Sequence, residues 1–421
     1  MNNDILTARE KKLLEINEYL SKNHVTVLVK ANIPGLDKNI PEASFLVNLF
    51  SLCIQKSYEV KQIISRDSVD GPYDIITVKS ISAHQLKRNF VDIENNHALG
   101  RLIDLDVFDD QPISISRSSL NLKPRKCYVC HRDAHICSRS KRHSIGILLN
   151  YVTSEVKKYL LFQIEKMVQH SMMIELNLND KFGLVCKDSN GSHDDMDYHL
   201  MVRAQNAILP YFVELFSIGY ESKDLKTLLE VSRPIGIKAE EKMLEVTLGV
   251  NAYKGLIFIL GLSVLSLGYT IKHQQNFNHI FENMIKITHS IYDDFEKQQY
   301  TAGITAYKKY QIYGIRGEVM HGMPSVKSAL LLLNDESDDT LRNVLKTLIL
   351  ISEDTVFLKR AKSLDSYHQI KKLFKNTDIS DPEQLKKINQ MMIDQNLSFG
   401  GSADLLIVTI FLKQIKMKFF K

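Results

Sequence analysis

Two patterns of apolar and polar positions divide the chain. Up to about residue 120, short apolar and β-branched runs stand between turn signals such as Asn32–Gly35 and Asp70–Pro72, which is the pattern of strands and loops. After about residue 145, apolar residues recur at helical spacing over long stretches with few Gly or Pro residues. We therefore expect an α+β domain over residues 1–155 and an all-α helical-bundle domain over residues 156–421.

The same patterns predict individual elements. The first domain should open with a helix at Ala8–Ser21. It should contain strands such as His24–Val29, Tyr73–Val78 and Leu102–Phe108. The second should contain helices at Ile145–Glu175, Ala204–Ile218, Ala252–Leu267, Phe277–Lys297, Ser325–Leu333, Thr340–Ile351, Pro382–Gln395 and Ala403–Lys416. The uncharged run Gly255–Ile271 is at the lower limit of length for crossing a membrane and contains Gly and Ser, so a buried core helix is favoured.

The composition is ordinary for a globular protein, with 421 residues, 44% hydrophobic and 24% charged. A net charge of +5 suits anionic ligands such as nucleotides and does not require nucleic acid. Five partly clustered cysteines argue against a secreted disulfide framework, and Met1–Leu20 lacks the apolar core of a signal peptide. We expect a cytoplasmic enzyme or binding protein that does not associate with membranes.

The stretch "LGRLIDLDVFDD" at Leu99–Asp110 contains the clearest candidate for chemistry. On a strand, Asp104 and Asp106 share one face while the apolar residues between and beside them occupy the other. Two carboxylates at this spacing suit Mg²⁺, which phosphoryl and nucleotidyl transfer require. A half-exposed strand without a metal would show the same alternation, so the motif alone leaves both interpretations open.

A basic segment, Lys123–His143, follows the carboxylate pair. Its cations outnumber a single acid, Asp133, and suit either a polyphosphate clamp or a solvated basic surface; they are Lys123, Arg125, Lys126, Arg132, Arg139, Lys141 and Arg142.

The same segment is rich in cysteine and histidine: Cys127, Cys130, His131, His135, Cys137 and His143. These are zinc-ligand types, but their spacing after the first pair is too tight for a standard finger. We expect a structural, basic segment that holds well under one zinc per chain. A zinc- and nucleic-acid-binding regulator is the alternative, and a single aromatic residue, Tyr128, gives it no stacking platform.

Polar loops between the predicted helices form the remaining candidates. The motif "NGSHDDMDYH" clusters carboxylates beside a histidine. The motif "LGVNAYKG" places polar groups at the start of a helix, where free backbone N–H groups favour phosphate. The motifs "GIRGEVMHGMP" and "SFGGSADLL" combine charged residues with glycine. Such loops build a site between helices. The residues are His193, Asp194, Asp195, Asn251, Lys254, Arg316, Glu318 and Asp404.

Taken in order, these motifs resemble two families that occur fused in some bacteria. "NIPG", "GRLIDLDV", "ISISRSSL" and "PRKCYVC" are similar to the phosphoribosyl-dephospho-CoA transferase that completes the citrate lyase acyl carrier protein. "GSHDDMDY", "GVNAYKG", "TAGITAY", "GIRGE" and "GGSADLL" are similar to triphosphoribosyl-dephospho-CoA synthases. The resemblance covers nearly the whole chain and implies a nucleotidyltransferase-like fold for the first domain.

The resemblance implies two steps. The helical half would join ATP to 3′-dephospho-CoA and release adenine, and the first half would pass the product to a serine of the acyl carrier (γ) subunit and release diphosphate. Asp104 and Asp106 would hold Mg²⁺ in the first half, with Arg101, Arg117 and Arg125 on the nucleotide. In the helical half, His193, Asp195, Glu318 and Asp404 would be catalytic, Asp194 and Asp195 would hold metal, and Asn251, Lys254 and Arg316 would hold the triphosphate.

The helical half departs from its family pattern. Cys186 stands where the family has aspartate, Tyr253 where it has histidine, Ala361-Lys362 where it has two glycines, and Phe399 where it has proline. A monofunctional transferase, whose helical half only binds the nucleotide or the lyase complex, therefore remains the alternative to a bifunctional enzyme.

Overall fold

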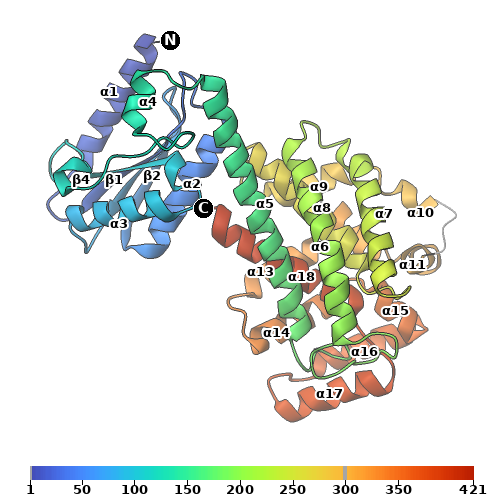
Figure 1. The fold of residues 1–421 in the computed structure, drawn as a ribbon. Coiled ribbons are helices and arrows are strands. Elements are labelled where there is room, and N and C mark those ends of the chain that lie inside the picture. The colour runs from blue at the N-terminus through green and yellow to red at the C-terminus, as the bar shows by residue number, and fades with distance from the viewer. Residues whose placement is uncertain (1, 297–300) are drawn as a thin grey trace. The chain divides into compact units, whose positions relative to one another are not determined.

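The computed structural model describes residues 2–296 and 301–421 (Figure 1). The chain forms two compact units, residues 1–160 with 417–421 and residues 161–416. The first is an α+β unit and the second is helical, as the sequence predicted.

A four-stranded antiparallel sheet in the order β2-β3-β1-β4 organises the first unit. Its strands are β1 (Val25–Ala31), β2 (Val60–Arg66), β3 (Tyr73–Val78) and β4 (Ile103–Phe108). Its helices are α1 (Asn2–Glu18), α2 (Pro41–Ser57), α3 (Ala83–Asn96) and α4 (Ala134–Arg139), with short 3₁₀ turns at Gly100–Leu102 and Ser118–Leu120.

The two faces of this sheet have different cover. Helices α2 and α3 pack on one face, against β1, β3 and β4 (Figure 1). On the other face, Ile16 of α1 packs with Leu28, Ile75 and Phe108. Because side chains alternate along β4, Asp104 and Asp106 point to the same face as Phe108, beside the part of that face that α1 covers.

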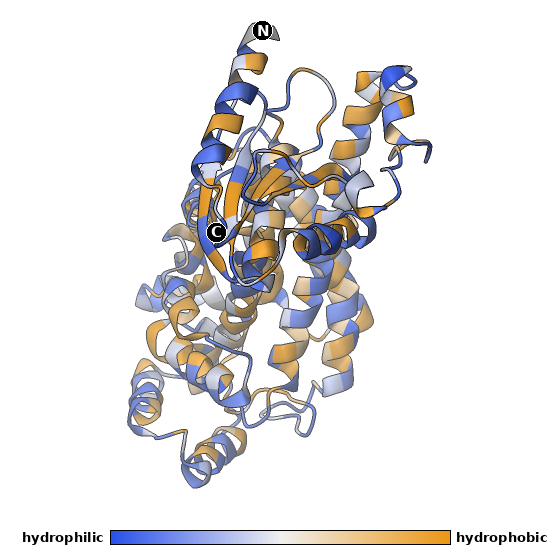
Figure 2. Cartoon of the chain, turned by 90° about the vertical axis from the view of Figure 1, so that its left-hand side faces the viewer, coloured by the Kyte–Doolittle hydropathy of each residue, from blue (hydrophilic) through white to orange (hydrophobic). Residues whose placement is uncertain are grey.

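The helical unit begins within α5 (Ile145–Asn177), and α6, α7, α8 and α9 pack against one another at its centre. Hydrophilic and hydrophobic bands alternate along its helices, as expected for amphipathic packing (Figure 2). The helices after α5 are α6 (Tyr198–Glu221), α7 (Leu228–Val246), α8 (Lys254–Lys272), α9 (His279–Ile287), α10 (Asp293–Glu296), α11 (Ala302–Tyr310), α12 (Gly314–Met320), α13 (Pro324–Leu332), α14 (Asp338–Ile351), α15 (Thr355–Ala361), α16 (Leu364–Asn376), α17 (Pro382–Asp394) and α18 (Gly400–Phe419).

One predicted helix is broken in the structure. The stretch Phe277–Lys297 was expected to be continuous, but α9 ends at Ile287, where Thr288 turns its hydroxyl back to Met284 O at 2.8 Å. Lys297 lies outside the described residues. Helix α8 is long and apolar enough to span a membrane, and most of it is buried among its neighbours, as predicted for a core helix.

Candidate functional sites

The carboxylate pair on β4 has the alternation that the sequence predicted. Asp104 and Asp106 are half-buried, whereas Ile103, Leu105 and Val107 between and beside them are fully buried. Both carboxylates line a cavity of about 630 Å³ on the sheet face that α1 partly covers.

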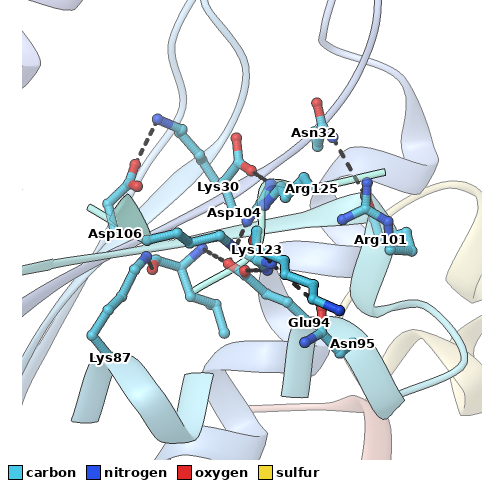
Figure 3. A network of polar contacts seen from close by, with 12 residues as sticks. Lys30, Asn32, Lys87, Glu94, Asn95, Arg101, Asp104, Asp106, Lys123 and Arg125 are labelled. Atoms are coloured by element: carbon cyan, nitrogen blue, oxygen red, sulfur yellow. Dashed lines mark hydrogen bonds and ion pairs between the residues drawn. The ribbon is translucent and has the colours of Figure 1, made fainter. Parts of the chain in front are cut away.

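Each carboxylate has a cationic partner (Figure 3). Lys30 lies opposite Asp104 in the β1–β4 ladder, and its Nζ pairs with Asp106 Oδ2 at 2.8 Å. Arg125 Nη1 donates to Asp104 Oδ1. Within the described residues, Asp104 Oδ2 and Asp106 Oδ1 accept no hydrogen bond. Each carboxylate therefore keeps one oxygen for a ligand.

A buried glutamate, Glu94, connects α3 to Arg125 and to the backbone of β4. The side chain of Glu94 on α3 is 0% exposed and receives both Arg117 Nη2 and Arg125 Nη2. Its Oε1 also accepts a hydrogen bond from Leu105 N at 3.2 Å, and Lys87 Nζ donates to Leu105 O at 2.6 Å. Burial lowers the pKa of Lys87, although the charge of Glu94 opposes this shift. Glu94 thus holds the segment that carries Arg125 against the strand that carries Asp104.

The cations that line the cavity are not those of the basic segment. They are Arg9, Lys12, Lys30 and Lys38, from α1, β1 and the loop after it. In this structure the predicted clamp residues pair with carboxylates of the chain: Arg125 reaches Asp104, Arg117 is directed to Glu94 and Lys126 to Asp133. Their role in phosphate binding stays a prediction.

Asp70 and the "NIPG" turn also contribute to this cavity, and Arg101 lies next to that turn. Asp70 also lines it; burial alone would raise the pKa of Asp70, but hydrogen bonds from Arg9 and Lys12 lower it to about 2. Arg101 is held through its backbone, since Asn32 Nδ2 donates to Arg101 O at 3.4 Å, and burial lowers its pKa. Asn32 and Ile33 of the "NIPG" turn line the cavity.

The helical unit has its own charged cavity, of about 360 Å³, lined by α6, α7, α8, α10, α11 and α12. Lys254, Arg316 and Arg233 line it together with Glu240 and Asp294. Lys254 Nζ pairs with Glu240 at 2.7 Å, and Arg233 Nη2 lies 2.9 and 3.1 Å from the two oxygens of Asp294. The sequence predicted Lys254 and Arg316 as phosphate ligands, and the fold brings them to one cavity.

Among the cations of this cavity, Arg316 has the surroundings that most favour an anionic ligand. Its Cζ lies 5.9 Å from the ring centre of Phe258 and 5.8 Å from that of Phe295. Its Nε is buried with no hydrogen-bond partner in the described part of the chain, and burial lowers its pKa. A buried cation with an unused donor is costly until an anionic group pairs with it.

Asp404, near the start of α18, lies against the N-terminus of α8. A Cβ atom at Gly255 would collide with Asp404 Oδ2, so only glycine fits there. Burial raises the pKa of Asp404 well above its usual range, and the nearby charges of Asp354 and Glu175 add to this shift. Asp354 is itself buried and accepts hydrogen bonds from Phe357 N at 2.9 Å and Ser402 N at 2.9 Å.

His193 belongs to a separate group at the other end of α15. Arg360 Nη2 donates to His193 Nδ1 at 2.9 Å, and Asp195 Oδ1 lies 3.7 Å from the same nitrogen. Arg360 is six residues after Asp354, the N-cap of α15, which separates them by about 9 Å along the helix. Asp194 and Asp195 are exposed, and within the described residues neither joins a compact group of three metal ligands.

Two predicted residues cap helices. Glu318 is buried and accepts hydrogen bonds from Ser325 N at 3.2 Å and from the Ser325 hydroxyl, at the start of α13. Asn251 Oδ1 accepts from Lys254 N at 3.2 Å, at the start of α8. Neither side chain lines the cavity that contains Arg316.

Comparison with known proteins supports the division into two activities. Residues 2–159 match the CitX family, apo-citrate lyase phosphoribosyl-dephospho-CoA transferase, and residues 161–419 match the CitG family, ATP:dephospho-CoA triphosphoribosyl transferase. Protein CitXG of Leuconostoc mesenteroides subsp. cremoris is 33% identical, with 93% of this chain and 91% of that protein covered. Protein CitXG of Haemophilus influenzae is 30% identical, with 97% and 94% covered. The chain belongs to the fused CitXG family.

Membership of the CitXG family makes the chain a bifunctional transferase. Its CitG half makes triphosphoribosyl-dephospho-CoA from ATP and dephospho-CoA, and its CitX half transfers the group to apo-citrate lyase. A 2-(5''-triphosphoribosyl)-3'-dephosphocoenzyme-A synthase of Haemophilus ducreyi is 31% identical over 67% of this chain and 98% of its own length.

Two of the departures from the CitG pattern, Tyr253 and Cys186, lie in the interior. Tyr253 is buried, its hydroxyl accepts a hydrogen bond from Gln205 Nε2 at 2.7 Å, and burial raises its pKa well above the usual range. Cys186 is also buried, in a turn where its N donates to Ser189 O at 2.8 Å. Both substituted side chains are therefore accommodated by the fold.

Several residues of the two sites escaped the sequence analysis. Lys30 is the single charge in the apolar strand "VTVLVKA", a signal that could have found it. Glu94 and Glu175 lie on helix faces whose orientation only packing decides. Asp354 and Arg360 become candidates once α15 is seen to connect Asp404 to His193.

Proposed function

We propose that the CitX half performs its transfer at the cavity beside β4, with Asp104 and Asp106 as its reactive centre. The observation that carries this proposal is that both carboxylates line one cavity and each keeps an unpaired oxygen. Mg²⁺ fits this donor set, because it takes one or two carboxylates and completes its shell with water and substrate phosphates. Bound there, it would supply charge stabilisation to the phosphates.

The residues of this chain then have separable tasks. A serine hydroxyl of the acyl carrier subunit attacks the phosphorus that stays with the prosthetic group. An O–P bond forms as the hydroxyl proton passes to water, and the bond to diphosphate breaks with its electron pair on the leaving oxygen. Lys30 and Arg125, already beside the carboxylates, are placed to offset the negative charge that grows on diphosphate. Asp104 and Asp106 would hold the Mg²⁺ that keeps the phosphates in line for the attack.

In the CitG half, we infer that the cavity with Arg316 holds the triphosphate of ATP. The ribose hydroxyl of dephospho-CoA attacks C1′ of the ATP ribose, and the bond from C1′ to adenine breaks with its electrons on the base. Asp404 accepts the hydroxyl proton, a task suited to a carboxylate whose pKa is raised by burial. The neighbouring carboxylates stabilise the positive charge that develops on the ribose.

Two assays separate these assignments. Loading of apo acyl carrier subunit from preformed triphosphoribosyl-dephospho-CoA reports on the CitX half, and adenine release from ATP reports on the CitG half. Asp104→Asn should abolish the first and keep the second, and Arg316→Met should do the reverse. If either variant affected both reactions equally, or neither, the assignment of that cavity would be wrong.

A further inference from the structure

Four potential metal ligands converge in the segment between β4 and α5. The sulfur atoms of Cys127, Cys130 and Cys137 and a ring nitrogen of His143 all lie within 4.8 Å of one another. Cys127 and Cys137 are buried, and Cys130 and His143 are half-buried. All of these cysteines are free thiols.

The local backbone is folded to bring them together. A tight turn carries Cys127 and Cys130, closed by Cys127 N donating to Arg132 O at 2.6 Å. His131 has φ +58°, the left-handed conformation that lets the chain reverse directly after the second cysteine. Helix α4 then presents Cys137, and a second left-handed residue, Lys141 at φ +45°, returns the chain to His143.

In the part of the chain that the structure describes, one nitrogen inside this cluster lacks a partner, and two of its sulfur atoms are in close contact. His143 Nε2 is buried with no hydrogen-bond partner among the described residues. Cys130 Sγ and Cys137 Sγ lie 3.2 Å apart without a covalent bond. Buried polar atoms normally have partners, so an unpartnered imidazole nitrogen facing three thiols indicates a missing ligand.

We propose that Cys127, Cys130, Cys137 and His143 bind one Zn²⁺ in a closed tetrahedral site. Thiolate and imidazole are the ligands of structural zinc, and four protein ligands leave no position for a substrate. This corrects the expectation drawn from spacing. Finger spacings describe finger folds, whereas here a tight turn and a short helix bring the ligands together.

The surroundings of the cluster suit such a centre. Three thiolates and Zn²⁺ leave one net negative charge, and the segment supplies an excess of cations to offset it: Lys126, Arg132, Arg139, Lys141 and Arg142. Ala134 N donates to Arg125 O at 2.8 Å, so the start of α4 is tied to the residue that reaches Asp104. The metal would thus fix the backbone from which Arg125 extends. The zinc site itself does not depend on the proposed function.

Metal content tests the proposal. The full chain, purified without chelator from zinc-sufficient medium, should contain about one zinc per chain by elemental analysis. Cys137→Ser should lose it, whereas Cys53→Ser, which removes a thiol outside the cluster, should keep it. Wild-type protein without stoichiometric zinc that also takes up none on titration would overturn the proposal, as would equal zinc in Cys137→Ser.

Two further measurements distinguish the loss of a zinc ligand from the misfolding of a variant. His143→Cys should retain about one zinc, because thiolate replaces imidazole as a ligand, whereas His143→Ala should not. Co²⁺ added to the chelator-treated full chain should give the visible absorption of tetrahedral thiolate coordination. A disulfide between Cys130 and Cys137 is the competing outcome: three of the five thiols would then react after denaturation without reductant, and not all five.

Discussion

Lys30 lies opposite Asp104 in the sheet, yet its ammonium group pairs with Asp106, at 2.8 Å. One cation therefore sits between two carboxylates on the same strand face, and it competes for Asp106 with any metal ion that binds there.

This relationship predicts the effect of Lys30→Met. The Mg²⁺ concentration for half-maximal loading of the acyl carrier subunit should fall, because Asp106 loses its competing partner. The maximal rate should fall about 10²-fold, because the leaving diphosphate loses a nearby cation. Lys123→Met is the matched control, since its side chain is exposed. An unchanged Mg²⁺ dependence would contradict the proposed competition.

Arg125→Met should destabilise the protein. It leaves Glu94, whose side chain is 0% exposed, with one arginine in place of two, and it leaves Asp104 without a partner. Breaking a buried ion pair from one side costs about 3 kcal/mol in the free energy of unfolding. Denaturant titration measures this loss. The control Lys79→Gln breaks an exposed pair with Glu59 and should change little, so equal stability of the two variants would refute the buried network.

His193 predicts a pH dependence of stability. Burial, and then the charge of Arg360, lower its pKa from 6.5 to about 4, although Asp195 opposes the shift. Between those values the unfolded chain binds the proton and the folded chain does not. The free energy of unfolding should therefore fall as the pH drops from 6.5 towards 4. Above pH 6.5 the contribution of His193 to it should be constant.

The variant His193→Asn isolates this contribution. Its amide oxygen can still accept from Arg360, but it does not titrate. The stability difference between wild type and variant, from denaturant midpoints at several pH values, should change across the same window. A difference that is constant with pH would show that His193 does not titrate as described.

Asp404→Asn should slow adenine release about 10²–10⁴-fold, the usual effect of removing a general base. Denaturant titration of the variant checks that it stays folded, so that a slower reaction is assigned to the lost carboxylate. Asp394→Asn, at the exposed end of α17, is the control. A wild-type rate of adenine release in the Asp404 variant would remove Asp404 from the reaction.

The sequence predicted features that depend on local periodicity. Asp104 and Asp106 share a face because the strand alternates, and helix α8 is buried because it carries no internal charge. The sequence could not predict that Lys30 is a partner of these carboxylates, because the pairing depends on the β1–β4 register. It could not predict the role of Glu94, because that role depends on how α3 packs. The sequence named the cysteines and His143 as possible ligands but not their convergence, because linear spacing does not show that His131 and Lys141 turn the chain left-handedly.

The central claim is that one chain both makes and transfers the prosthetic group, despite Cys186 and Tyr253 in its CitG half. Mass spectrometry of apo acyl carrier subunit after incubation with the full chain, ATP, dephospho-CoA and Mg²⁺ tests it most directly. We predict that the subunit gains the mass of the phosphoribosyl-dephospho-CoA group, and only when both ATP and dephospho-CoA are present. A gain seen only with preformed triphosphoribosyl-dephospho-CoA would contradict the claim and reduce the CitG half to a binding domain.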